Sequence, residues 1–380
     1  MNAERVETSE FLIPLKVNPM RVRRTYSGGL GIDLWHDQRG CFGNSRPEEW
    51  LASVTKAINP GFPEETGEGL SRVFWNGKTV LLKELIELYP RQMLGERHLR
   101  EVGNTLGILA KMIDSAERLS IQVHPDKAFS RKWFYSEYGK TECWYILAAS
   151  EAGGEQPYLL IGFRPEVTQA RWRQLYERQD IEGMIGCMHK ITPRKGEVWL
   201  IKGGLPHAIG PGCFLLELQE PTDYTMRTEK TRSDGSLLPE LLIHQGAGDE
   251  GLLQCFHYDN VTEEQLRQKC CILPQTKKLS DAGEWTKLVG KEQTPCFSMA
   301  AAVVNTALHF PAAEGFAIAV VLRGSGSVET ATGSLKTAQG DQMFFPSDMR
   351  EFTLRAQAGQ TFEVLLCYPP KAELHEPSAG

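Results

Sequence analysis

The sequence lacks features that would each point to a particular class of protein. No apolar run approaches the roughly 20 residues that a membrane-spanning helix needs, and the polar, acidic start has neither the cationic nor the apolar region of a signal peptide. The nine cysteines include no C-x-x-C pair, which predicts reduced, buried thiols in place of disulfides or a cysteine zinc site. We therefore expect a cytoplasmic protein without a membrane partner.

The sequence also lacks long clusters of positive charge: its only basic run is the short segment 21–24. The net charge of −6 gives no overall field that would attract nucleic acid, and we expect no nucleic-acid partner. What the chain does have is 380 residues, of which 41% are hydrophobic, enough for the cores of two or three domains. This composition leaves the oligomeric state open.

Apolar residues recur at helical spacing in two places. One is 79–88, ended by Pro90, and the other is 165–187. We expect short strands at 143–147, 196–201, 214–218, 317–322 and 362–367. Many short strands separated by glycine predict a mainly β protein, a sandwich or jelly roll, with a few helices packed alongside. The charged segment 273–295 has no periodicity and predicts a linker.

Four side chains form a candidate metal site. If Ser120-Ile-Gln-Val-His124 is extended, its period of two places Gln122 and His124 on one face. Glu142 precedes an apolar strand and His207 follows a glycine-rich turn, so together they offer two nitrogens and two oxygens to one divalent cation. Taken singly, each has an ordinary structural explanation, such as a turn histidine or a surface amide. The set suits Zn²⁺ with an open position, but two histidines and a carboxylate also suit Fe²⁺ or Mn²⁺.

One spaced pattern occurs twice and indicates the architecture. The two copies run Gly196, Lys202, Gly204, His207 and Gly340, Pro346, Asp348, Glu351. Both resemble the second cupin motif, G-x5-P-x-G-x2-H, and only the first keeps its histidine. The resemblance implies two cupin-type jelly-roll modules, an N-terminal metal-binding one within residues 1–272 and a degenerate C-terminal one within 296–370.

The order of these pieces resembles the class I mannose-6-phosphate isomerases. The blocks that carry the resemblance are residues 47–53, 119–127, 139–147, 206–210 and 216–227, and the run Leu-Ser-Ile-Gln-Val-His-Pro-Asp is the most specific of them. It implies that the ligands of one Zn²⁺ per chain are Gln122, His124, Glu142 and His207. It also implies interconversion of mannose 6-phosphate and fructose 6-phosphate through a cis-enediolate.

The same resemblance assigns roles around the metal. It implies Arg227 as the active-site arginine, Lys111, Lys140 and Glu217 as candidates for proton transfer, and Ser120 and Lys230 as binding residues for a sugar phosphate. Alternatives stay open at two positions: Arg227 in a surface salt bridge with Asp223 or Glu229, and Lys111 solvated on a helix face.

Two other functions also stay open. The residues after Arg227 depart from the family pattern, which leaves the exact sugar and the need for a 6-phosphate undecided. One alternative is a cupin that binds a sugar without catalysing its conversion. The other is an iron-dependent oxygenase, which also uses two histidines and a carboxylate as metal ligands.

Overall fold

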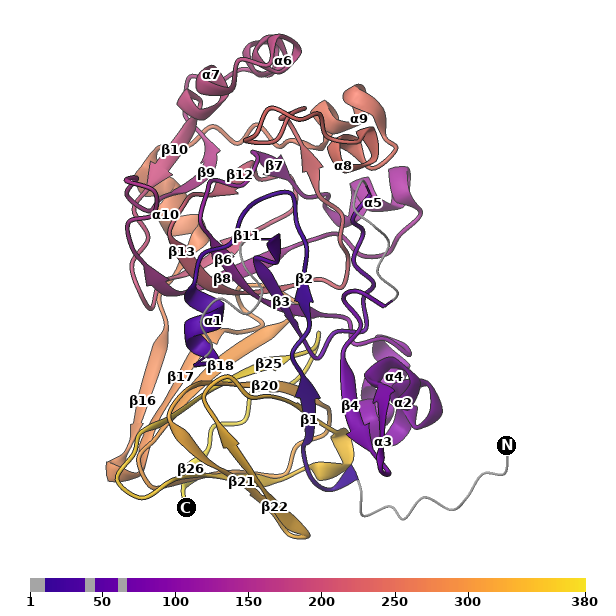
Figure 1. Cartoon of the computed structure of the whole chain (residues 1–380), viewed down its shortest axis with the longest axis vertical. Coiled ribbons are helices and arrows are strands. Elements are labelled where there is room, and N and C mark those ends of the chain that lie inside the picture. The colour runs from indigo at the N-terminus through magenta and orange to yellow at the C-terminus, as the bar shows by residue number, and fades with distance from the viewer. Residues whose placement is uncertain (1–10, 38–44, 61–66) are drawn as a thin grey trace.

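The computed structural model describes residues 11–37, 45–60 and 67–380. Its strands form four sheets, two in each of two modules (Figure 1). The larger sheet of the first module contains, in spatial order, β15 (Cys271–Ile272), β11 (Val198–Ile201), β8 (Glu142–Ala149), β13 (Cys213–Gln219), β6 (Leu109–Ser115), β3 (Glu48–Leu51) and β2 (Arg21–Val22). The smaller sheet contains β10 (Met188–Ile191), β9 (Leu159–Phe163), β12 (His207–Ile209), β7 (Gln122–Val123) and β14 (Met226–Arg227).

The second module repeats this arrangement. Its larger sheet runs β16 (Gln275–Leu279), β17 (Gly283–Val289), β18 (Ser298–Val304), β25 (Phe362–Tyr368), β20 (Ala317–Arg323), β23 (Gln342–Phe345), β1 (Leu15–Asn18), β4 (Arg72–Trp75) and β5 (Lys78–Leu81). Its smaller sheet runs β22 (Gly333–Ala338), β21 (Ser325–Thr330), β24 (Phe352–Ala356), β19 (Ala307–Phe310) and β26 (Ser378–Ala379). The order β11-β8-β13-β6-β3 in one module matches β23-β20-β25-β18-β17 in the other, which confirms the predicted mainly β, two-module cupin fold.

The repeated motif lies at the same place in both modules. Gly196 and Gly340 have φ of +88° and +90°, a left-handed conformation that glycine adopts without strain. β11 and β23 each begin two residues later. The five strands expected from the sequence are all present.

The predicted helices are present in altered form. Within 79–88 the first residues belong to β5 and the helix is α2 (Leu82–Leu88), while Pro90 begins α3 (Pro90–Leu94). The helix expected over 165–187 is divided at Gln179, which has φ of +51°. The other helices are α1 (Gly31–Trp35), α4 (Glu96–Glu101), α5 (Lys127–Phe134), α6 (Gln169–Arg178), α7 (Ile181–Gly186), α8 (Glu240–His244), α9 (Gly248–Cys255) and α10 (Glu263–Cys270).

The linker prediction for 273–295 is wrong, because β16 and β17 occupy most of this segment. β16 is the edge of its sheet and four of its five residues are exposed. An edge strand that is exposed and charged lacks the alternation of apolar and polar residues, so its sequence resembles that of a loop. The division into 1–272 and 296–370 stays a prediction, and β1, β4 and β5 from the first range lie in the sheet of the second module.

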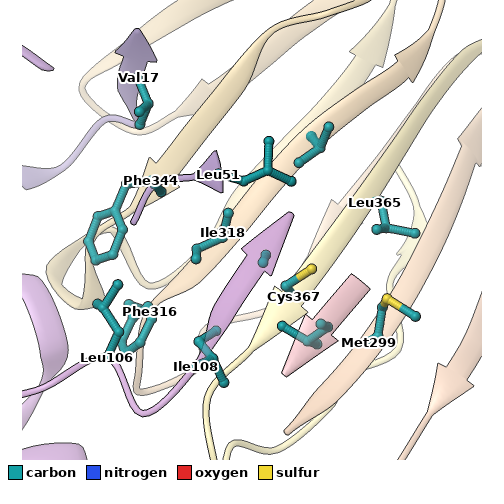
Figure 2. Close-up of a cluster of buried hydrophobic side chains, with 14 of the residues drawn as sticks. Val17, Leu51, Leu106, Ile108, Met299, Phe316, Ile318, Phe344, Leu365 and Cys367 are labelled. Atoms are coloured by element: carbon teal, nitrogen blue, oxygen red, sulfur yellow. The ribbon is translucent and has the colours of Figure 1, made fainter. Parts of the chain in front are cut away.

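A shared hydrophobic core joins the modules. Figure 2 shows side chains from both parts of the chain in this core, with Leu51 and Ile108 near Ile318 and Cys367. The eight cysteines in the described ranges are all free, as the sequence predicts. No helix in these ranges is long and apolar enough to cross a membrane.

Candidate metal centre and substrate cleft

One row of side chains crosses the smaller sheet of the first module. Gln122 on β7 pairs with His207 on β12 and with Arg227 on β14. Residues directly opposite in an antiparallel sheet project from the same face, so these three share the interior face of the barrel. His124 follows β7 by one residue, and Glu142 begins β8 in the facing sheet.

The predicted ligands converge. The Nε2 atoms of His124 and His207 lie 3.2 Å apart, and the Glu142 carboxylate lies 3.1 Å from His124 Nε2 and 3.7 Å from His207 Nε2. The Gln122 amide nitrogen is 3.2 Å from His207 Nε2. Ligand atoms of His124, Glu142 and His207 all lie within 4.8 Å of one another and the three residues are buried, so the structure brings the four predicted side chains together.

Backbone carbonyls fix both imidazoles. His124 Nδ1 donates to the Tyr224 carbonyl at 2.9 Å, and His207 Nδ1 donates to the Leu205 carbonyl at 2.8 Å. Because a carbonyl only accepts, each Nδ1 carries the hydrogen and each Nε2 presents a lone pair to the cluster. Burial lowers the pKa of both histidines, and the Lys140 ammonium lowers the His124 pKa further. Both imidazoles are therefore neutral, the form that binds metals.

The Glu142 carboxylate supplies negative charge. Burial alone would raise its pKa, but the Lys140 ammonium holds that pKa well below its usual value. Lys140 Nζ lies 2.5 Å from Glu142 Oε2 and 2.8 Å from His124 Nε2, and Trp144 donates to Oε1 at 2.9 Å. Two neutral imidazoles and an ionised carboxylate aimed at one point, with an amide beside them, fit a divalent cation. These residues can therefore hold a metal ion at this point.

A second row crosses the larger sheet and faces the first. Trp50 on β3, Lys111 on β6, Glu217 on β13 and Trp144 on β8 are successive partners. Lys111 Nζ lies 3.3 Å from Glu217 Oε1, and Trp144 donates to Glu217 Oε2 at 3.2 Å. The alternative that Lys111 is solvated on a helix is wrong, since it lies on a strand and is 3% exposed.

The charges of this second row differ between its members. Burial would lower the Lys111 pKa, but Glu48 and Glu217 raise it above its usual value, so Lys111 remains a cation. Burial and the nearby Glu142 charge raise the Glu217 pKa. Glu217 Oε1 makes no hydrogen bond within the described chain, which leaves a lone pair free beside the cleft.

Arg227 has no acidic partner in the described ranges. Its Nη1 donates to the carbonyls of Leu242 at 2.7 Å and Thr225 at 3.4 Å. The alternative of a salt bridge is wrong, because Asp223 pairs with Arg24 and Glu229 with Arg118.

The two rows border a small cleft. Its lining includes Lys111, Ser120, Gln122, Lys140, Glu217 and Arg227. Lys230 is not among the lining residues: its Nζ pairs with Asp249 at 2.9 Å and lies over the Tyr176 ring.

Sequence reasoning missed a group of ionic residues at the cleft wall. Glu48 accepts from Arg24 Nε at 2.9 Å, Tyr26 at 2.9 Å and Trp50 at 2.8 Å. Burial would raise the Glu48 pKa, but Arg24, Lys111 and these hydrogen bonds lower it to about 2. Glu48 and Trp50 lie in a block already noted for its resemblance, yet only the fold brings Arg24 and Asp223, 199 residues apart, into contact.

Comparisons with known proteins identify similar proteins. Residues 68–149 match the family described as phosphomannose isomerase type I, catalytic domain. A mannose-6-phosphate isomerase of Streptococcus mutans is 25% identical over 305 residues, covering 76% of this chain and 85% of that protein.

Solved structures share the fold. The mannose 6-phosphate isomerase of Bacillus subtilis superposes with a TM-score of 0.73 at 23% identity, over 94% of this chain and 99% of that one. A zinc-bound mannose 6-phosphate isomerase superposes with a TM-score of 0.69 at 15% identity, over the same shares.

Fold and site together define a protein of cupin-type fold with a buried cluster of side chains that can hold a metal ion. The resemblance to class I mannose-6-phosphate isomerases found in the sequence is confirmed by the family match and by these relatives, and it supports an enzyme of the aldose–ketose isomerase class.

Proposed function

We propose that the protein is a zinc-dependent isomerase that interconverts mannose 6-phosphate and fructose 6-phosphate. The observation that carries the proposal is the convergence of His124, Glu142 and His207 opposite a row that contains Glu217. Isomerisation needs a proton removed at C2 and returned at C1, with negative charge developing on O1 and O2. A divalent cation, when bound, stabilises that charge as a Lewis acid.

Gln122, His124, Glu142 and His207 would hold one zinc ion per chain. The amide oxygen of Gln122 suits the metal once the amide turns about its last bond, because oxygen is the donor atom of an amide. The carbonyls of Tyr224 and Leu205 keep each imidazole in the orientation that ligation requires.

Arg227 would stabilise the developing charge. Its guanidinium lies in line with Gln122 across β7 and β14 and has no carboxylate partner within the described residues. A half-buried guanidinium without an internal anion favours an external one, which supports contact with the substrate.

Of the three candidates for proton transfer, we assign the shuttle to Glu217. A carboxylate whose pKa is raised by burial is closer to the operating pH than an ordinary one. Lys111 is fixed as a cation between Glu48 and Glu217, so it positions Glu217. Lys140 contacts the atoms of His124 and Glu142 that would bind the metal, so we do not assign it the shuttle. Ser120 in the cleft lining would bind the phosphoryl group.

A coupled assay for fructose 6-phosphate tests the proposal. The protein is stripped with a chelator, assayed, and assayed again after zinc is returned; we expect loss and recovery of activity. Saturable binding of mannose 6-phosphate without product would support the sugar-binding alternative. Oxygen uptake with Fe²⁺ would support the oxygenase.

A further inference from the structure

Arg24 lies in the wall of the substrate cleft, a position that nothing in the local sequence predicts. It is 8% exposed and lines the same cleft as Ser120 and Arg227. It is also the cation in that lining with the most hydrogen-bond partners among the described residues.

The contacts of Arg24 can be counted against its five N–H groups. Nε donates to Glu48 at 2.9 Å. Nη1 donates to Asp223 Oδ2 at 3.1 Å and to Asn59 Oδ1 at 3.2 Å, and Nη2 donates to Asp223 Oδ1 at 3.0 Å. One Nη2 hydrogen is left without a partner in the described chain, on a guanidinium that two carboxylates hold rigidly.

The neighbours of Arg24 favour an anion. Burial and then the positive charge of Arg24 lower the Arg227 pKa to about 10, so the two guanidiniums are close enough to repel. Arg227 donates only to backbone carbonyls, and the described residues give the Ser120 hydroxyl no hydrogen-bond partner. An anion beside Arg24 would relieve the repulsion and accept hydrogen bonds from Arg24 and Ser120.

We propose that Arg24 is a substrate-binding residue that, together with Ser120, holds the phosphoryl group of the sugar phosphate. This inference rests on the proposed function. It replaces the binding role expected of Lys230, which is committed to Asp249 outside the cleft lining. Because Glu48 and Asp223 fix the guanidinium in advance, little conformational freedom remains to be lost on binding.

The test is the substitution Arg24→Lys, which keeps a cation beside Glu48 and Asp223 but removes the planar guanidinium and its five N–H donors. Loss of one charged hydrogen bond weakens binding about tenfold or more. We expect KM for mannose 6-phosphate to rise by about that factor with kcat within about twofold, and the inhibition constant of inorganic phosphate to rise in parallel. For unphosphorylated mannose, kcat/KM should not change.

The matched control is Arg355→Lys, a surface guanidinium paired with Glu329 in the second module, which should change none of these values. If Arg24→Lys does not fold, as thermal unfolding would show, the double variant Arg24→Gln with Asp223→Asn removes a charge of each sign and should show the same rise in KM.

An unchanged KM for the phosphate ester, or an equal loss of kcat/KM for both sugars, overturns the role of Arg24. If the wild type turns over neither sugar, the proposed function fails, and calorimetric titration of the zinc-loaded protein with inorganic phosphate then decides: Arg24→Lys must weaken phosphate binding about tenfold for the proposal to stand.

Discussion

Gln122 and His207 face each other across β7 and β12 of the first module, whereas Phe310 and Phe352 face each other across β19 and β24 of the second. These strands hold the same places in the two smaller sheets. The polar pair belongs to the candidate metal site, and the aromatic pair stacks with ring centroids 4.6 Å apart.

The facing sheets differ in the same way. Glu142 pairs with Ile201 at the start of β8, and Ala317 pairs with Phe345 at the start of β20. The second module therefore has apolar side chains where the first has its predicted metal ligands. The two modules share a strand order but differ in the side chains that face the interior. The fold therefore determines where side chains lie, and the identity of those side chains determines whether a module can carry out chemistry.

The largest contrast is expected from the histidines. His124→Ala or His207→Ala should reduce isomerase activity to the assay background and lower zinc binding, because loss of even the groups that orient ligands costs about 10–100-fold. His309→Ala in the second module should retain both. Equal activity in all three variants would show that the first module is no metal centre; coupled turnover and zinc titration measure the difference.

A smaller but still large effect is expected at Glu48. Glu48→Gln should lower the free energy of unfolding by about 3–5 kcal/mol, because Arg24 and Lys111 then lose a buried counter-charge. The matched control is Glu329→Gln in the second module, whose carboxylate pairs with Arg355 on the surface and should cost less than about 1 kcal/mol. Denaturant unfolding of both variants compares them, and equal losses would contradict the prediction.

Acid should remove the Glu48 contribution. Its pKa is about 2 in the folded protein against 4.5 for the unperturbed group, so the stabilisation is complete above about pH 4.5 and is lost as the pH falls towards 2, amounting to roughly 3 kcal/mol. The difference in unfolding free energy between the wild type and Glu48→Gln should therefore narrow over this window. A constant difference would mean that Glu48 is not ionised in the folded state.

The smallest effect on catalysis is expected from the aromatic pair. Phe352→Ala should lower the free energy of unfolding by about 3 kcal/mol through the cavity it leaves, yet kcat and KM should stay at wild-type values below the unfolding transition. Thermal unfolding and the coupled assay together check this. Reduced kcat in a fully folded variant would show that the second module contributes to turnover.

The sequence predicted those parts of the molecule that have a local pattern. Strand periods placed Gln122 and His124 on one face, and the glycine spacing located His207. The contact of Arg24 with Asp223 spans 199 residues and has no local pattern, so only the folded chain reveals it. The helix break at Gln179 depends on a left-handed backbone conformation at this residue. Residues other than glycine seldom adopt this conformation, so the sequence does not predict the break.

β1 has a consequence for how the chain can be divided. It lies between β23 and β4 in the sheet of the second module. The strand that pairs with β23 therefore comes from the N-terminal part of the chain. A fragment starting after residue 272 would leave β23 with an open edge able to recruit a strand from another molecule. The two halves are interlocked, and proteolysis or truncation between them should yield self-associating pieces in place of two independent proteins.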